Sequence, residues 1–179
     1  MRRSLIGIAL SLAALGFGCQ AALASSFKVQ NDHLIVPDRR IGPVALGMSD
    51  KDLFKVFVPQ GTTPFGKWIV YDYGEFRIYV HGGTHRVVAI VLHQFDHDAD
   101  PYHTAEGVKL GSSLQDVQAA LGPPEVVKGN PFFGHATTDV KYRAGNLQFD
   151  FDKLNASMAD APTRNVQSIR IQSPGAGLF

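Results

Sequence analysis

The strongest constraint on the fold of this chain is an internal repeat. Residues 44–59 and 108–123 align at a constant offset of 64 residues. The identical pairs are Val44/Val108, Leu46/Leu110, Gly47/Gly111, Ser49/Ser113, Asp52/Asp116 and Pro59/Pro123. A second block follows at 71–80 and again at 142–151, where a shared tyrosine and glycine precede apolar residues at every second position. Because such a repeat marks one supersecondary unit, we expect two similar lobes.

Each copy of the first block predicts a short helix. Ser49 and Ser113 stand at N-cap positions, where a serine oxygen accepts a hydrogen bond from a free N–H of the first turn. An aspartate three residues later can bond back to the cap and complement the helix dipole. Apolar residues then recur at helical spacing, and Pro59 or Gly122 ends the helix. The apolar residues are Leu53, Val56 and Phe57 in the first copy and Val117, Ala120 and Leu121 in the second.

The later blocks predict strands, because apolar and polar residues alternate along them. Gly82 and Gly83 mark a hairpin turn between two of these strands. The predicted strands cover residues 68–73, 76–80, 87–93, 140–142, 147–151 and 165–171. We therefore predict an α+β fold of two tandem repeats, each a helix followed by an antiparallel meander. The lobes either keep separate sheets or share one curved sheet.

The chain divides into five predicted segments. Residues 1–24 are predicted to be a signal peptide and residues 25–40 an N-terminal extension. The first repeat covers 41–95 and the second covers 107–179. Residues 96–106, which are rich in polar side chains and contain a proline, form the predicted linker.

The first 24 residues have the three regions of a secretory signal. Arg2 and Arg3 precede an apolar run at 5–17, and a small-x-small cleavage site follows before Ser25. The apolar run is too short to span a bilayer, which takes about 20 residues. We therefore expect a periplasmic or secreted protein with no membrane span. A lipid anchor at Cys19 is the alternative, although a glycine stands three residues before it where a lipobox has leucine.

Charge and cysteine content argue against a nucleic-acid-binding protein and against a disulfide-stabilised fold. The chain has 17 basic and 16 acidic residues and one cysteine. Loss of the predicted signal removes two arginines and the cysteine, which leaves a nearly neutral chain that cannot form a disulfide. A nearly neutral chain lacks the basic surface that nucleic-acid binding requires, so we expect no nucleic-acid partner and a fold that rests on its apolar core.

Strand alternation also predicts a binding face. It places one set of side chains on the sheet face opposite the core, and aromatic residues and arginine are enriched at interface hot spots. These candidate partner-binding residues are Trp68, Arg77, Tyr79, His81, Val91 and His93. The alternative is that the other lobe or residues 27–36 cover Trp68 and Tyr79, since large aromatic side chains are mostly buried. The corresponding set in the second repeat, including Gln148, Asp150, Ser168 and Arg170, is typical of a solvated face.

Two loops carry phenylalanine between proline and glycine, at 64–66 and 131–134. Such residues can insert into a partner or fold back as plugs on the core. We favour the plug, because an exposed aromatic patch needs a functional reason.

Metal and catalytic signals are weak. His93, His97 and His103 are the candidate metal ligands, but their spacing matches no standard zinc site. A polar linker after a strand explains the cluster better, so no metal or other cofactor is predicted. The sequence contains no G-x-S-x-G, H-E-x-x-H or C-x-x-C motif. We expect no enzyme, and a hydrolase whose triad assembles in space is the less favoured alternative.

The repeated phrase L-G-x-S-x-x-D, at 46–52 and 110–116, resembles that of two protein families when it is followed by Y-x-x-G and alternating apolar residues. These are the β-lactamase inhibitor protein and the BamE (SmpA/OmlA) outer-membrane lipoproteins, and the resemblance covers 41–93 and 105–172. It implies a periplasmic or secreted module whose exposed sheet face binds another envelope protein. We therefore expect a non-enzymatic inhibitor, immunity or envelope-assembly factor, with a small-ligand or divalent-metal-binding protein as the alternative.

Overall fold

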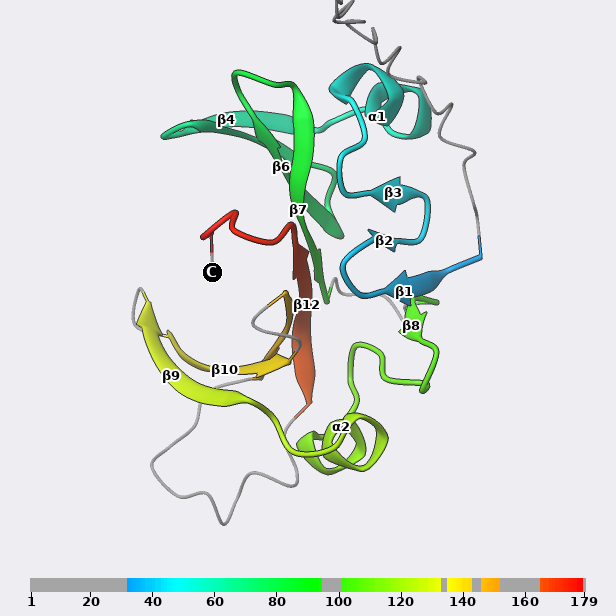
Figure 1. Cartoon of the computed structure of the whole chain (residues 1–179), viewed down its shortest axis with the longest axis vertical. Helices are drawn as coiled ribbons and strands as arrows, with labels where there is room; N and C mark the ends of the chain where they lie inside the picture. The colour runs from blue at the N-terminus through cyan, green and yellow to red at the C-terminus, as the bar shows by residue number, and fades with distance from the viewer. Residues whose placement is uncertain (1–31, 95–100, 133–134, 143–145, 152–164, 179) are drawn as a thin grey trace, which may run out of the picture.

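The chain folds into a mostly β structure with two short helices. The computed structural model describes residues 32–94, 101–132, 135–142, 146–151 and 165–178, with backbone alone within 126–138. Two sheets of eight and four strands dominate this part of the chain (Figure 1). The predicted α+β class of two helix-plus-meander repeats is therefore wrong. It undercounted the strands and lacked a second sheet.

The large sheet is antiparallel throughout, in the order β4–β5–β6–β7–β12–β11–β10–β9. Two sequential four-stranded meanders thus meet where β7 pairs with β12. The strands are β4 Gly61–Phe65, β5 Trp68–Asp72, β6 Phe76–His81, β7 Arg86–His93, β9 Val126–Phe132, β10 His135–Tyr142, β11 Leu147–Phe151 and β12 Val166–Gln172. The six strands predicted from alternation are confirmed, and β10 begins five residues earlier than expected.

The small sheet comes from segments that carried no strand signal. Its order is β3–β2–β1–β8, with β1 and β8 parallel. The strands are β1 Leu34–Val36, β2 Arg40–Ile41, β3 Val44–Ala45 and β8 His103–Thr104. Strands of two or three residues are too short for alternation to be visible, which is why they were not predicted. Strand β1, in the predicted extension, pairs with β8, in the predicted linker.

The helices begin where the sequence predicts. Helix α1 spans Asp50–Val56 and α2 spans Leu114–Leu121. Ser49 accepts a hydrogen bond from the Asp52 N–H, and Ser113 forms a complete capping box with Asp116. Neither helix, nor any other in the described residues, has the length and apolar character needed to cross a membrane.

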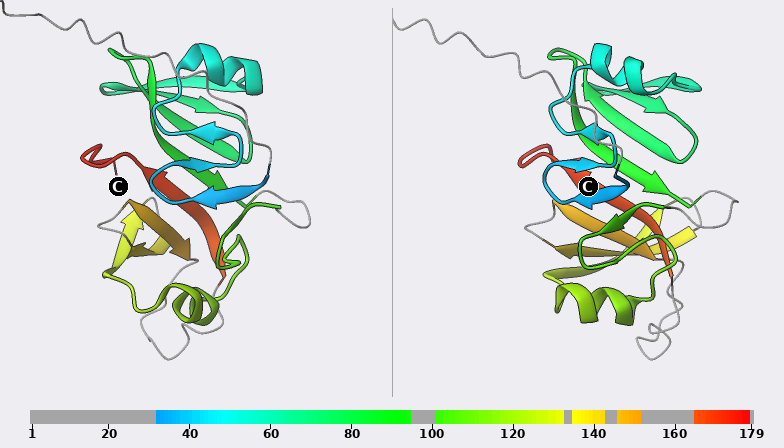
Figure 2. Two further views of the ribbon diagram at one scale, coloured as in Figure 1. Left: turned by 45° about the vertical axis from the view of Figure 1, so that its right-hand side comes forward. Right: turned by 90° about the vertical axis from the view of Figure 1, so that its right-hand side faces the viewer.

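Both helices and the small sheet lie on one side of the curved large sheet (Figures 1 and 2). We call that side the helix face. Its core is continuous across both meanders, because Phe76 pairs with Leu92, Leu92 with Ile169, and Ile169 with Phe149, all of them fully buried. The opposite side is the concave face, and its described side chains include Trp68, Asp72, Arg77, Tyr79, His81, Val91, His93, Gln148, Asp150, Ser168 and Arg170.

Both edges of the large sheet carry a proline next to the hairpin tip. Pro64 of β4 pairs with Ile69, and Pro131 of β9 pairs with Ala136. The two segments were predicted to be loops, and they are edge strands instead. Since proline has no N–H to offer, it is confined within sheets to open edges and discourages pairing with another strand there.

Candidate binding face

Cross-strand register brings the six predicted partner-binding residues onto the concave face. Trp68 is opposite His81, Arg77 is opposite Val91, and His93 continues the same face of β7 two residues further on. Their exposure differs widely. Arg77 is exposed, and Tyr79, His81 and His93 are half-buried. Val91 is buried, with 2% of its surface exposed.

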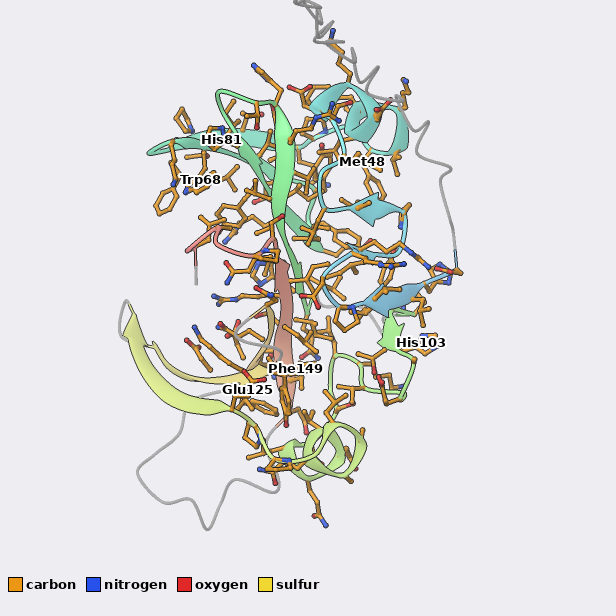
Figure 3. All side chains as sticks on the ribbon, viewed as in Figure 1. Met48, Trp68, His81, His103, Glu125 and Phe149 are labelled. Atoms are coloured by element: carbon orange, nitrogen blue, oxygen red, sulfur yellow. The ribbon has the colours of Figure 1, made fainter. Side chains whose placement is uncertain are left out.

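Trp68 is packed against its neighbours. Its ring meets His81 edge-on at 5.2 Å between centroids, and the Lys67 ammonium lies 4.5 Å from the ring centroid. Figure 3 shows Trp68 and His81 side by side on the concave side, with Met48 and His103 on the opposite side. With 9% of its surface exposed, Trp68 shapes this surface more than it offers area for contact.

Phe65 stands out at the edge beside Trp68. The two residues are opposite each other across the hairpin, and Phe65 is 59% exposed. The expectation that this phenylalanine plugs the core is therefore wrong. The side chains of Phe132 and Phe133 lie outside the described residues.

A pocket of about 400 Å³ opens where four successive strands of the first meander end or begin. Asp72 and Arg77 face each other across β5 and β6, with 3.7 Å between the Asp72 Oδ2 and an Arg77 terminal nitrogen. Both side chains are 45% exposed, so this ion pair is weak. The pocket is lined by Gln60, Gly61, Asp72, Gly74, Arg77, His93 and Gln94.

His93 is the most perturbed base of the concave face. Burial lowers the pKa of its imidazole to about 4, and the charges of Arg77 and Arg170 add to that effect. The ring is therefore neutral at neutral pH. Its Nε2 atom is buried and has no hydrogen-bond partner among the described residues.

The second half of the concave face is a buried polar network centred on Asp150. Asp150 pairs with Arg170 at 2.6 Å, accepts a hydrogen bond from the Gln148 amide at 2.9 Å, and accepts another from the Ser168 hydroxyl. Gln148, Asp150 and Ser168 are each at most 4% exposed. The prediction of an ordinary solvated face is wrong here.

Asp139 lies beside this network, opposite Asp150 across β10 and β11. Burial, followed by the negative charge of Asp150, raises the pKa of Asp139 to about 6. Asp139 and Asp150 are neighbouring carboxylates, and the Arg170 guanidinium pairs with Asp150. This arrangement favours a neutral Asp139, because like charges disfavour ionising both.

The C-terminal segment lies on the concave side near β7 and β12 (Figure 1). The Ser173 N–H donates to the Val88 carbonyl at 2.8 Å, and the Leu178 N–H donates to the Gln172 side-chain oxygen at 3.3 Å. Within the described chain, this segment after β12 therefore lies over the concave side of the sheet.

The three candidate metal ligands do not form a site in the described part of the chain. His93 ends a strand of the large sheet, and His103 belongs to the small sheet. His97 lies outside the described residues. No group of three or more metal-ligating side chains occurs among the residues that the structure covers.

The serines that a hydrolase would use have structural roles. Ser49 and Ser113 cap helices, and Ser168 donates to Asp150. No serine lines the pocket that contains His93. Ser168 lies directly opposite His93 across β12 and β7, and its hydroxyl donates to Asp150.

Sequence reasoning missed most of the pocket. Gln60, Gly74 and Gln94 lie just outside the strand ends, where alternation says nothing about direction. A usable signal existed for Gly74 and Gln94, because each adjoins the end of a predicted strand and the ends of adjacent strands meet in space. Gln60 adjoins β4, which was not predicted.

Comparison with known proteins gives only a loose likeness of fold. No protein-family model matches the chain, and no curated protein matches it. Similar solved structures include a DUF4309 family protein (YjgB) from Bacillus subtilis, with 15% identity over 70% of this chain and 78% of that one, at a TM-score of 0.45. Another is a cysteine-rich secretory protein (SAV1118) from Staphylococcus aureus, with 14% identity over 83% of this chain, 51% of that chain and a TM-score of 0.45.

Proposed function

We propose that this protein is a non-enzymatic binding module that contacts another envelope or secreted protein through the first half of its concave face. One observation carries the proposal. The helices and the small sheet all cover the helix face, which leaves Arg77, Tyr79 and His81 on a face without a covering layer of secondary structure in the described chain.

The edge strands of the large sheet favour partner binding through a sheet face over partner binding through a sheet edge. Pro64 and Pro131 oppose the addition of a further strand, which is the usual way a sheet edge recruits a peptide. The exposed ring of Phe65 extends the concave face at its rim and adds apolar area. Aromatic side chains next to arginine are the composition of interface hot spots.

The resemblance to the β-lactamase inhibitor protein and to BamE-like lipoproteins agrees with this role and with a periplasmic or secreted location. Within the proposal, the protein acts as an inhibitor, immunity or envelope-assembly factor. The resemblance names no target for this chain.

A capture experiment tests the proposal. We would immobilise the protein, expose it to periplasmic extract, and compare it with a variant that combines Arg77→Glu and Tyr79→Ser. Loss of a hot-spot contact weakens binding about tenfold or more, so the variant should lose a partner that the unmodified protein retains.

The matched control changes charge and apolar area on the other side of the molecule. Lys51→Glu with Val58→Ser alters α1 and the loop after it, where Val58 is 84% exposed. Equal capture by all three folded proteins would contradict the proposed face.

A small-ligand-binding protein is the second candidate function. The pocket around Asp72, Arg77 and His93 favours it, because its volume falls within the range of small-molecule sites.

A further inference from the structure

The pocket at the end of the first meander contains an arginine and a histidine that have few partners inside the protein. The Nε2 atom of His93 is buried without a partner among the described residues. The Arg77 guanidinium makes its ion pair with Asp72 at 3.7 Å, which is longer than a hydrogen bond. Leaving a buried polar group unpaired is unfavourable, so a ligand group that forms a hydrogen bond with the His93 ring would relieve it.

The charges around His93 favour an anion. Arg77 lines the pocket, and the Arg170 guanidinium lies on the same ladder row, since both residues pair with Val91 from opposite sides. After burial, the positive charges of these two arginines lower the pKa of His93, against the opposing effects of Asp150 and Asp72. Arg170 is paired with Asp150 at 2.6 Å, which leaves the loosely paired Arg77 as the cation that can attract an anionic ligand in the pocket.

Asp72 limits how much negative charge the pocket can accept. Its carboxylate lines the same pocket and accepts a hydrogen bond from the Gly74 N–H at 3.0 Å. A phosphate dianion would be repelled by it and would need more than one free guanidinium. A single carboxylate matches one guanidinium, which binds it through two parallel N–H groups.

We propose that this pocket binds a monocarboxylate, with the ligand's carboxylate held by the Arg77 guanidinium beside the His93 imidazole. The side-chain amides of Gln60 and Gln94 offer further hydrogen bonds to the rest of the ligand. This inference rests on the second candidate function, and its pocket shares Arg77 and His93 with the proposed protein-binding face. The carboxylate can come from a small metabolite or from the C-terminus of a peptide.

The test uses N-acetylglycine as the probe and N-acetylglycinamide as its uncharged match. The protein is labelled with ¹⁵N, and the imidazole nitrogen resonances of His93 are followed during titration. We expect a saturable shift of the His93 ring resonance with N-acetylglycine and none with the amide. No saturable shift with the carboxylate, or an equal shift with the amide, would overturn the proposal.

Variants separate binding from folding. Arg77→Gln, followed through the His93 resonance, and His93→Gln, followed through backbone amide resonances, should each weaken N-acetylglycine binding by about tenfold, which corresponds to one charge-assisted hydrogen bond. Asp72→Asn keeps an oxygen for the Gly74 N–H and removes the competing charge, so it should tighten binding severalfold. Lys51→Gln removes one positive charge from α1 and should leave affinity unchanged. Weaker binding by Asp72→Asn would count against an anion in this pocket.

A tetrapeptide with a free C-terminus, compared with its amidated form, distinguishes the two sources. Tighter binding of the free peptide than of N-acetylglycine identifies a peptide end, and equal binding identifies a small carboxylate. Capture of a protein partner without any His93 shift would overturn the carboxylate pocket alone, and a His93 shift without any captured protein would count against the binding module alone.

Discussion

The two halves of the concave face use similar residues in opposite ways. In the first half, Arg77 and Asp72 are half-exposed and 3.7 Å apart. In the second half, Arg170 and Asp150 are largely buried and 2.6 Å apart, and Asp150 has two further hydrogen-bond donors. The two arginines belong to the same row of the sheet, on either side of Val91.

This difference suggests that the first half of the concave face serves binding and the second half serves stability. Groups that satisfy one another inside the protein are costly to disturb and have little left to offer a ligand. Exposed groups with loose partners add little to stability and remain available. The first half is thus suited to recognition, and the second half fixes the structure that positions it.

The largest expected effect tests whether the halves share one core. Phe76→Ala and Phe149→Ala each empty a fully buried position on the helix face. We expect each to lower the free energy of unfolding by about 3–5 kcal/mol, with a single transition in urea monitored by circular dichroism. Two separated transitions in either variant would show that the meanders unfold independently.

The next effect contrasts the two ion pairs. Arg170→Met leaves Asp150 buried without its cation, next to Asp139, and should cost about 3 kcal/mol. Arg77→Met should cost no more than about 0.5 kcal/mol, because its pair is exposed. Chemical denaturation of both variants measures the difference. Similar losses would remove the distinction between the halves.

Strand alternation explains which of these features could be predicted. It located the central strands and the shared face of Trp68, Arg77 and His93, because the period of two is a local property. It gave no sign of β4 and β9, since the described side chains of β4 are all exposed and both strands contain proline. The small sheet has strands too short to show any period.

The burial of Asp150 could not be read from local pattern. Polar residues at every second position usually indicate a strand face that is exposed to solvent. The same pattern also arises on a buried face when the polar groups pair with one another across strands. Ser168 and Arg170 reach Asp150 only through the pairing of β11 with β12, which depends on residues 18 or more positions away.

A smaller effect concerns pH in the second half. The folded state raises the pKa of Asp139 from 3.8 to about 6. Above pH 6 the folded protein therefore bears the cost of an ionised Asp139, and this cost disappears as pH falls toward 4. Because a tenfold change in acid dissociation corresponds to about 1.4 kcal/mol, Asp139→Asn should raise stability by about 1–3 kcal/mol at pH 7.5 and hardly at all at pH 4. Urea denaturation at both pH values measures this gain, and an equal gain at both would contradict it.

His93 in the first half has the opposite sign. Its folded-state pKa is lowered from 6.5 to about 4, so below pH 6.5 the unfolded chain takes up a proton that the folded protein does not. Stability is complete above pH 6.5 and is lost as pH falls toward 4. His93→Gln should therefore lose less stability than the unmodified protein between pH 7 and pH 4. A steeper loss in the variant would contradict the assignment.

The smallest effects should be equal in the two halves, because the helix starts are the feature that the repeat preserves best. Ser49 and Ser113 each accept a hydrogen bond from the third residue of their helix at 3.1 Å. Replacing either with alanine should cost about 1 kcal/mol, measured by urea denaturation, with the two losses within a few tenths of each other. Ser→Gly at the same positions should recover most of the loss, since glycine is tolerated at N-caps. Unequal losses would mean that the two helices have diverged as far as the two halves of the concave face. Equal losses would show that the helix starts have kept the same stabilising role in both halves while the concave face has diverged.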